Sequence, residues 1–195
     1  MGKVTLNMSM SLDGFIAGPN VDVELPMGKG GLRLHDWLFN SSTSEVDAAV
    51  EREIFAATGA VILGRRTFDV GVQEWRDTPF PVPCFVLTHR PRAVLVKKSG
   101  TFTFVSDGIE SALQQAQAVA AEKNISLMGA DVAQQFLKAG LLDEIQINLV
   151  PVLLGDGVRL FDHLDIEPME LEKTRVLDSP AVTHLSLRVV KERPL

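Results

Sequence analysis

Cysteine is almost absent from this sequence of 195 residues, in which Cys84 is the only one. One cysteine cannot form a disulfide within the chain, and this is typical of proteins from a reducing compartment. The first residues lack the basic-then-apolar order of a signal peptide. No apolar run approaches the roughly 18 residues that a membrane span requires. These absences predict a soluble, cytoplasmic protein without a membrane partner.

Several motifs of catalysis and nucleotide binding are also missing. The sequence contains no GxGxxG fingerprint, no GxxxxGK[ST] loop and no GxSxG elbow. Its four histidines lie far apart, and none is spaced from another histidine or from the cysteine as zinc ligands are. Cys84 lies in an apolar segment, where an inert buried thiol is expected rather than a nucleophile. We therefore expect no metal site and no covalent catalysis, whereas hydride transfer from a bound cofactor needs no protein nucleophile.

Positive charge is in deficit, since 19 Lys and Arg residues stand against 25 Asp and Glu residues, for a net charge of −6. Binding along a nucleic-acid backbone needs a basic face, so we expect no nucleic-acid partner. Two short basic clusters are present, Arg65-Arg66 and the group of His89, Arg90 and Arg92. They are either solvated surface residues or contacts of one small phosphorylated ligand.

The hydrophobic pattern predicts one α/β domain over residues 1–195. Short, wholly apolar segments, typical of strands covered on both faces, alternate with segments of helical periodicity. From Leu142 onward, apolar and polar residues alternate, as in antiparallel strands. The predicted strands cover residues 60–63, 82–87, 101–105, 125–128, 145–149, 168–177 and 181–190, and the predicted helices cover residues 45–57, 109–120 and the segment between residues 129 and 140.

This order of elements predicts a mixed, mostly parallel sheet with helices on both faces and an antiparallel C-terminal hairpin. Residues 3–12 alternate like a strand with one buried face, and the following Asp13-Gly14 offers a turn. Residues 18–31 are rich in glycine and have no period, which predicts a long loop of the kind that often forms a lid or a binding segment. Ser44 is the expected N-cap of the helix over residues 45–57.

Three junctions after predicted strands carry residues suited to an anionic ligand. In open α/β sheets, ligands bind beyond the carboxyl ends of strands, where helix N-termini offer free N–H groups. Residues 64–67 combine a glycine, two cations and a hydroxyl, residues 87–90 add a second basic junction, and residues 128–132 place small residues at a helix start. Each junction alone is a common structural feature, but three together favour an anionic dinucleotide. Asp13, at the mouth of the first strand, is either a catalytic group or a residue of the turn.

Five segments, in this order along the chain, resemble the dihydrofolate reductase fold. The resemblance is narrower to its bacterial riboflavin branch, which comprises the C-terminal reductase domain of the bifunctional riboflavin biosynthesis protein RibD and its free-standing relatives. The segments most specific to that branch are the Gly-Arg-x-Thr piece at residues 64–67 and the segment over residues 151–161. The five are MSLDGFIA at residues 10–17, GAVILGRRTF at 59–68, GADVAQQFL at 129–137, GLLDEI at 140–145 and PVLLGDGVRLF at 151–161.

The resemblance implies a reductase that uses NADPH. It assigns contacts with the cofactor to four groups of residues: Gly64, Arg65, Arg66 and Thr67 at the adenosine-side phosphates; Leu87, Thr88, His89 and Arg90 at the adenine ribose and its 2′-phosphate; Met128, Gly129, Ala130, Asp131 and Val132 at the pyrophosphate; and Met8, Ser9, Ile16 and Ala17 at the nicotinamide.

The resemblance also implies where the substrate lies. Asp13 and the turn at residues 153–157, which includes Leu153 and Gly155, would face it. Residues 26–37 form an insertion typical of free-standing relatives, and we expect this insertion to shape the pocket, with its own residues His35 and Trp37 as walls.

Two positions depart from the family pattern. The family usually has Gly-Gly where this chain has Met128-Gly129, at a peptide bond that is often cis in relatives. A methionine there either narrows the cofactor cleft or points away from it. Folate reductases carry a carboxylate on their first helix that binds the pterin, and Asp47 is the nearest counterpart, at a spacing from Gly64 that differs by one residue.

The preferred hypothesis is the reduction of a small heterocycle, either a pyrimidine ribotide or a pterin-like ring. The best-known substrate of the family is 5-amino-6-(5-phosphoribosylamino)uracil of riboflavin biosynthesis. One alternative is a true dihydrofolate reductase, and another is a nucleotide-binding protein without catalysis. The resemblance further predicts a homodimer, formed through the hydrophobic strand over residues 145–154.

Overall fold

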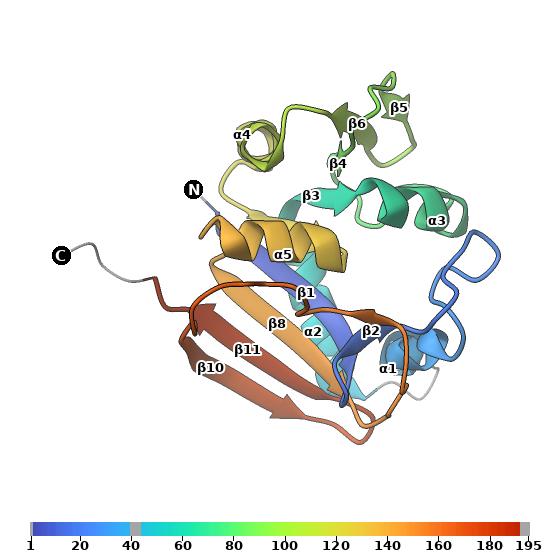
Figure 1. Cartoon of the computed structure of the whole chain (residues 1–195), viewed down its shortest axis with the longest axis vertical. Helices are drawn as coiled ribbons and strands as arrows, with labels where there is room; N and C mark the ends of the chain where they lie inside the picture. The colour runs from blue at the N-terminus through green and yellow to red at the C-terminus, as the bar shows by residue number, and fades with distance from the viewer. Residues whose placement is uncertain (1, 40–43, 192–195) are drawn as a thin grey trace.

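A computed structural model of the chain describes residues 2–39 and 44–191, and nine of their strands form one sheet (Figure 1). The ends of the predicted domain, residues 1 and 192–195, lie outside the described residues. Across the sheet the strands are β10 (Leu171–Asp178), β11 (Thr183–Val189), β8 (Glu144–Val150), β1 (Val4–Ser11), β7 (Asn124–Met128), β3 (Thr58–Gly64), β4 (Cys84–Leu87), β6 (Thr101–Val105) and β5 (Leu95–Val96).

The sheet is mixed and mostly parallel, as predicted. The neighbours from β8 through β1, β7, β3 and β4 to β6 all run parallel. The antiparallel pairs lie at the two edges, and one of them, β10 with β11, is the predicted C-terminal hairpin. A separate two-stranded sheet joins β2 (Phe15–Ala17) to β9 (Val158–Arg159), which the sequence pattern did not predict.

Helices cover both faces of the sheet, also as predicted. In Figure 1, α5 (Ala130–Lys138) lies in front of the sheet and α2 (Glu45–Ala57) lies behind it. The core beside α4 (Ile109–Ala120) and α5 includes Leu6, Ile62 and Phe136, whereas α3 (Arg65–Trp75) packs through Phe68 over a second core that includes Leu63. No helix among the described residues is both long enough and apolar enough to cross a membrane.

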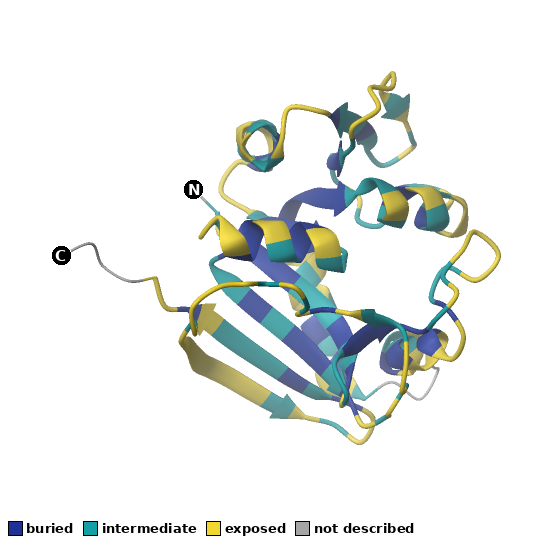
Figure 2. Cartoon of the chain, in the orientation of Figure 1, coloured by how far each residue is buried: buried dark blue, intermediate teal, exposed yellow. Residues whose placement is uncertain are grey.

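The strand β1 is buried on both faces, so the expectation of one buried face is wrong. Val4 and Leu6 on one face are buried, and Thr5 and Ser9 on the other face are buried as well (Figure 2). The reason is the position of β1 between β7 and β8, in the centre of a sheet that has helices on both sides. The alternation therefore marks an apolar and a polar interior rather than an interior and a surface.

The predicted loop over residues 18–31 is present as far as residue 30 and is folded back on itself. The Gly18 N–H donates to the Met27 carbonyl at 2.9 Å, and the Lys29 N–H donates to the Pro19 carbonyl at 2.8 Å. Gly28 has φ +67, and a Cβ on it would lie 2.2 Å from the Gly18 carbonyl oxygen, so this close return requires glycine. The 3₁₀ helix η1 (Gly31–His35) and the short helix α1 (Asp36–Phe39) follow.

We expect Phe136→Ala to lower the free energy of unfolding by about 3–5 kcal/mol, because its fully buried ring would leave a cavity between α5 and the sheet. Phe161→Ala is the matched control, since this ring is 40% exposed. Urea denaturation of the two variants measures the difference. An equal loss in both would contradict the placement of Phe136 in the core.

Candidate functional site

A large cleft of about 1590 Å³ opens where the parallel strands β1, β3, β4, β6 and β7 end. The predicted loop, η1, α1 and α2 form its other walls. Its position is that of ligand sites in open α/β sheets, beyond the carboxyl ends of the strands.

All three predicted junctions line this cleft, because they follow the adjacent strands β7, β3 and β4. The four residues predicted to border the nicotinamide line it too. The cleft therefore contains every residue that the resemblance assigns to the cofactor: Met8, Ser9, Ile16, Ala17, Gly64, Arg65, Arg66, Thr67, Leu87, Thr88, His89, Arg90, Met128, Gly129, Ala130, Asp131 and Val132.

The N-termini of α3 and α5 meet at this end of the sheet. Gly129 precedes α5 with φ +96, and a Cβ on it would lie 2.6 Å from the Thr67 Oγ1 in the first turn of α3. A side chain at this position would separate the two helix ends. No side chain caps the helix at Gly64 or at Gly129, so first-turn N–H groups of both helices remain available to an anion.

The basic residues of the junctions differ in how they are held. The Arg65 Nε donates to both carboxylate oxygens of Asp69 at 2.8 Å, which partly neutralises its charge. The Arg66 Nη2 donates to the Val21 carbonyl at 3.3 Å and so connects α3 to the loop across the cleft. The side chain of Arg90 is exposed. The backbone N–H of Arg90 donates to the Thr88 Oγ1 at 3.1 Å, which shapes the second junction.

Met128 lines the cleft, and its side chain packs against the core that contains Phe68. This packing favours the second of the two expectations for a methionine here, in which its side chain points away from the cofactor. The bond from Met128 to Gly129 is trans, like the other peptide bonds of the described residues.

His35 and Trp37 both line the cleft, where the sequence predicts the substrate walls. The Trp37 Nε1–H donates to the Ser9 Oγ at 3.0 Å, which ties α1 to β1. Burial lowers the pKa of His35, although the nearby Asp36 opposes this, and burial thus favours the neutral imidazole. The Nδ1 of His35 is buried and makes no hydrogen bond to any described residue.

Asp13 lies outside the cleft lining, and so do Leu153 and Gly155, contrary to the expectation that they face the substrate. The carboxylate of Asp13 accepts hydrogen bonds from the Ser11 hydroxyl at 2.6 Å, the Leu154 N–H at 3.2 Å and the Gly155 N–H at 2.7 Å. It therefore pins the turn at residues 153–157 to the end of β1. These contacts support a structural role for Asp13 rather than a catalytic one.

Asp47 also lies outside the cleft lining, because its carboxylate points to the buried His184 on β11. Glu51, one turn further along α2, is the carboxylate of this helix that does line the cleft. Motif spacing favoured Asp47, but it does not show toward which side of α2 a carboxylate points.

On the strands of the large sheet, the sequence prediction missed three polar residues of the cleft lining, namely Asn7, Ser126 and Asn148. Asn7 lies on the polar face of β1, which the alternation was expected to turn toward solvent. A run of polar side chains on several neighbouring apolar strands is the signal that could have identified them. Among the described residues, no group of three or more His, Cys, Asp and Glu could hold a metal ion.

The strand predicted to form a dimer interface is internal. β8 lies between β1 and β11, so Ile145 and Ile147 are buried within the chain itself, whereas Leu153 beyond the strand is 69% exposed. The homodimer stays a prediction, and its interface cannot be made by the two isoleucines.

Comparison with known proteins connects this site to a family. The model of the RibD C-terminal domain matches residues 2–184. The uncharacterized protein YwjB of Bacillus subtilis (strain 168) is 26% identical over 170 residues, which are 85% of this chain and 86% of that protein.

Solved structures with the same fold include two that cover nearly the whole chain. A protein assigned to riboflavin biosynthesis in Shewanella sp. PV-4 aligns with a TM-score of 0.75 and 22% identity, over 98% of this chain and 100% of that one. Dihydrofolate reductase from Enterococcus faecalis, in a complex with NADP(H), aligns with a TM-score of 0.61 and 15% identity, over 97% and 98%. The predicted dihydrofolate reductase-like fold is thus confirmed.

We expect Asp13→Asn to lower the melting temperature at neutral pH, and the loss to shrink in acid. The hydrogen bond from Ser11, together with those from Gly155 and Leu154, lowers the pKa of Asp13 from 3.8 to about 2, although burial opposes this. The folded state thus prefers the ionised carboxylate, so its stabilisation is complete above pH 3.8 and is lost as the pH falls toward about 2. Thermal unfolding across this range measures the effect. Asp107→Asn, at an exposed carboxylate, is the control, and an equal, pH-independent loss in both variants would argue against the pinning role.

Proposed function

The chain belongs to the RibD C-terminal domain family, and on this premise we propose that it is a reductase that transfers hydride from NADPH to a small heterocycle. The observation that carries the proposal is the convergence of three anion-ready junctions in one cleft. Two of them are helix N-termini without capping side chains, and the third brings an exposed arginine. A dinucleotide with several phosphates matches this arrangement better than a ligand with one phosphate.

In this proposal, the two helix ends at Gly64 and Gly129 hold the phosphates through backbone N–H groups. Thr88, His89 and Arg90 bind the 2′-phosphate that distinguishes NADPH from NADH, because a guanidinium can form two hydrogen bonds with a phosphate. The nicotinamide rests at the end of β1, beside Met8, Ser9, Ile16 and Ala17.

The bound cofactor would supply the hydride, and the protein would orient the two reactants and exclude water. Ile16 and Ala17 are buried apolar residues beside the proposed nicotinamide position. Leu25 and Met27, in the loop over residues 18–30, also line the cleft. These walls favour close contact between the rings and a dry reaction site.

The proposed substrate is a pyrimidine ribotide or a pterin-like ring. Trp37 offers an aromatic wall, while Asn7 and Asn148 place carboxamides on the floor of the same cleft. A heterocycle with ring carbonyl and N–H groups fits an apolar cleft with a few polar groups. Among the members of this class, 5-amino-6-(5-phosphoribosylamino)uracil is the first to test.

Dihydrofolate reduction is the second candidate, and Glu51 is the observation that favours it. A carboxylate on α2 inside the cleft could accept hydrogen bonds from the amino and ring N–H groups of a pterin. A nucleotide-binding protein without catalysis differs from both candidates, because it would bind NADPH but never oxidise it.

NADPH is expected to raise the melting temperature and NADH to raise it less, because a ligand that binds only the native state must stabilise it. Arg90→Gln should weaken NADPH binding about tenfold and leave NADH binding unchanged, since one charge-assisted contact is lost. Calorimetric titration measures both affinities, and Arg52→Gln, at an exposed arginine of α2 outside the cleft lining, is the control. Failure of NADPH to stabilise the native protein would sink the proposal.

Methotrexate separates the two candidate substrates. A pyrimidine reductase should bind it weakly, with little difference between the native protein and Glu51→Gln. A folate reductase should bind it tightly and lose about tenfold or more in Glu51→Gln, because the charged acceptor is removed. Fluorescence titration of both proteins decides between them, with NADPH oxidation on dihydrofolate as the second readout.

A further inference from the structure

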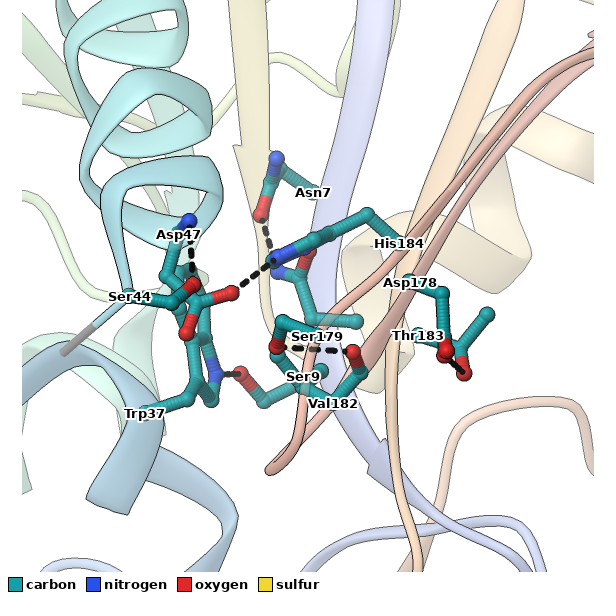
Figure 3. A network of polar contacts seen from close by, with 11 residues as sticks. Asn7, Ser9, Trp37, Ser44, Asp47, Asp178, Ser179, Val182, Thr183 and His184 are labelled. Atoms are coloured by element: carbon teal, nitrogen blue, oxygen red, sulfur yellow. Dashed lines mark hydrogen bonds and ion pairs between the residues drawn. The ribbon is translucent and has the colours of Figure 1, made fainter.

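Behind the floor of the cleft, a chain of buried polar side chains runs from α2 into the sheet (Figure 3). Asp47 Oδ1 lies 2.9 Å from His184 Nε2, and His184 Nδ1 lies 2.7 Å from Asn148 Oδ1. The Asn148 Nδ2 donates to the Asn7 Oδ1 at 3.1 Å, and the Asn7 Nδ2 donates to the Gln146 Oε1 at 2.8 Å. The chain thus connects a carboxylate outside the cleft to two amides that line it.

The hydrogen bonds define the charge of His184. Both of its ring nitrogens face oxygen atoms, one of a carboxylate and one of an amide, and each contact requires an N–H on the imidazole. His184 with a proton on both nitrogens is an imidazolium. Loss of the Nδ1 proton would require Asn148 to turn its NH₂ toward the ring, and Asn7 and Gln146 would then have to reverse as well.

The surroundings favour this ion pair. Asp47 is 2% exposed and His184 is 5% exposed, so neither charge could be buried without the other. Burial raises the pKa of Asp47, but hydrogen bonds from His184, Ser179 and Ser44 and the charge of His184 outweigh it and hold the pKa below its ordinary value. The rings of Trp37 and His184 pack in a T-shaped arrangement, with 5.0 Å between their centroids.

Other charged groups on neighbouring elements do not compete for His184. Glu53 on α2 forms an ion pair with Arg175 on β10, and both residues line a smaller cavity behind the amides, of about 170 Å³. Glu51 on α2 and His35 on η1 face the cleft. Asp47 is therefore the carboxylate partner of His184 among the described residues.

We infer that Asp47 and His184 are positioning residues, which fix the amides of Asn148 and Asn7 in one orientation on the cleft floor. In this chain of bonds, each amide nitrogen uses one of its two N–H groups and retains a second one. The floor then offers N–H donors to the edge of a ring that carries acceptors, such as a pyrimidine carbonyl. This inference rests on the proposed function for the identity of the substrate class, but the charge of His184 does not depend on it.

Nitrogen-15 NMR of labelled histidines in the native protein tests the charge directly, with His184→Gln to identify the signals. We expect both nitrogens of His184 to carry a proton in the native protein near neutral pH, because each faces an oxygen atom. In Asp47→Asn, which removes the negative charge beside Nε2, we expect one of the two nitrogens to be unprotonated. Glu53→Gln is the matched carboxylate-to-amide control on the same helix, and it should match the native protein. A native His184 with an unprotonated nitrogen near neutral pH would overturn the inference.

Ligand binding tests the amides, with uridine 5′-monophosphate as the pyrimidine probe in the presence and absence of NADPH. We expect Asn148→Leu and Asp47→Asn to weaken binding of the probe about tenfold, because a donor is lost or turned away. NADPH affinity should stay the same in both variants, and a circular dichroism melt confirms that they fold. Unchanged probe affinity in folded Asn148→Leu, or no binding of the probe to the native protein, would contradict recognition by the amides. Failure of the native protein to bind NADPH would instead contradict the proposed function.

Discussion

The central strand β1 is buried on both faces, and this constraint shapes the rest of the molecule. Each of its side chains must find its partners inside the protein, because water reaches neither face freely. Leu6 on one face joins the core beside α4 and α5. On the other face, Ser9 is buried and Asn7 is half-buried at the cleft, and Gln146, Asn148 and Trp37 supply their hydrogen-bond partners. The polar floor of the cleft thus follows from the position of β1 between two layers of helices, and the hydrogen-bond partners come from distant parts of the chain.

The convergence of the three junctions on one cleft could be predicted from the sequence because their geometry belongs to short, contiguous segments. A strand that ends at Gly64 or Met128 and leads into a helix places its first N–H groups at the sheet edge, wherever the rest of the chain lies. The mostly parallel pairing of the strands and the C-terminal hairpin follow from hydrophobic patterns of the same local kind, whereas the order of the strands across the sheet was not predicted. The residues that the resemblance assigns to the substrate depend on side-chain directions across elements, and four of them, Asp13, Asp47, Leu153 and Gly155, lie outside the cleft lining.

Motif spacing favoured Asp47, whereas the carboxylate that lines the cleft is Glu51, one turn further along α2. The difference is made by His184, a residue that periodicity places in an ordinary strand. A buried carboxylate needs a partner of opposite charge, and the partner comes from β11, which alternation shows only as a member of the hairpin. No local stretch of sequence shows a tertiary pairing of this kind. The polar residues Asn7, Ser126 and Asn148 on neighbouring strands, however, could have indicated that this face of the sheet is polar.

The separation of Asp47 and His184 along the chain, 137 residues, has a consequence for the order of assembly. Proteins are made from the N-terminus, so α2 and the three junctions at residues 64–67, 87–90 and 128–132 emerge before β11. Until the hairpin adds to β8, the carboxylate of Asp47 lacks its partner His184 and must stay hydrated, which opposes full docking of α2 on the sheet. The buried network around Asp47 and His184 would thus be among the last parts of the fold to form.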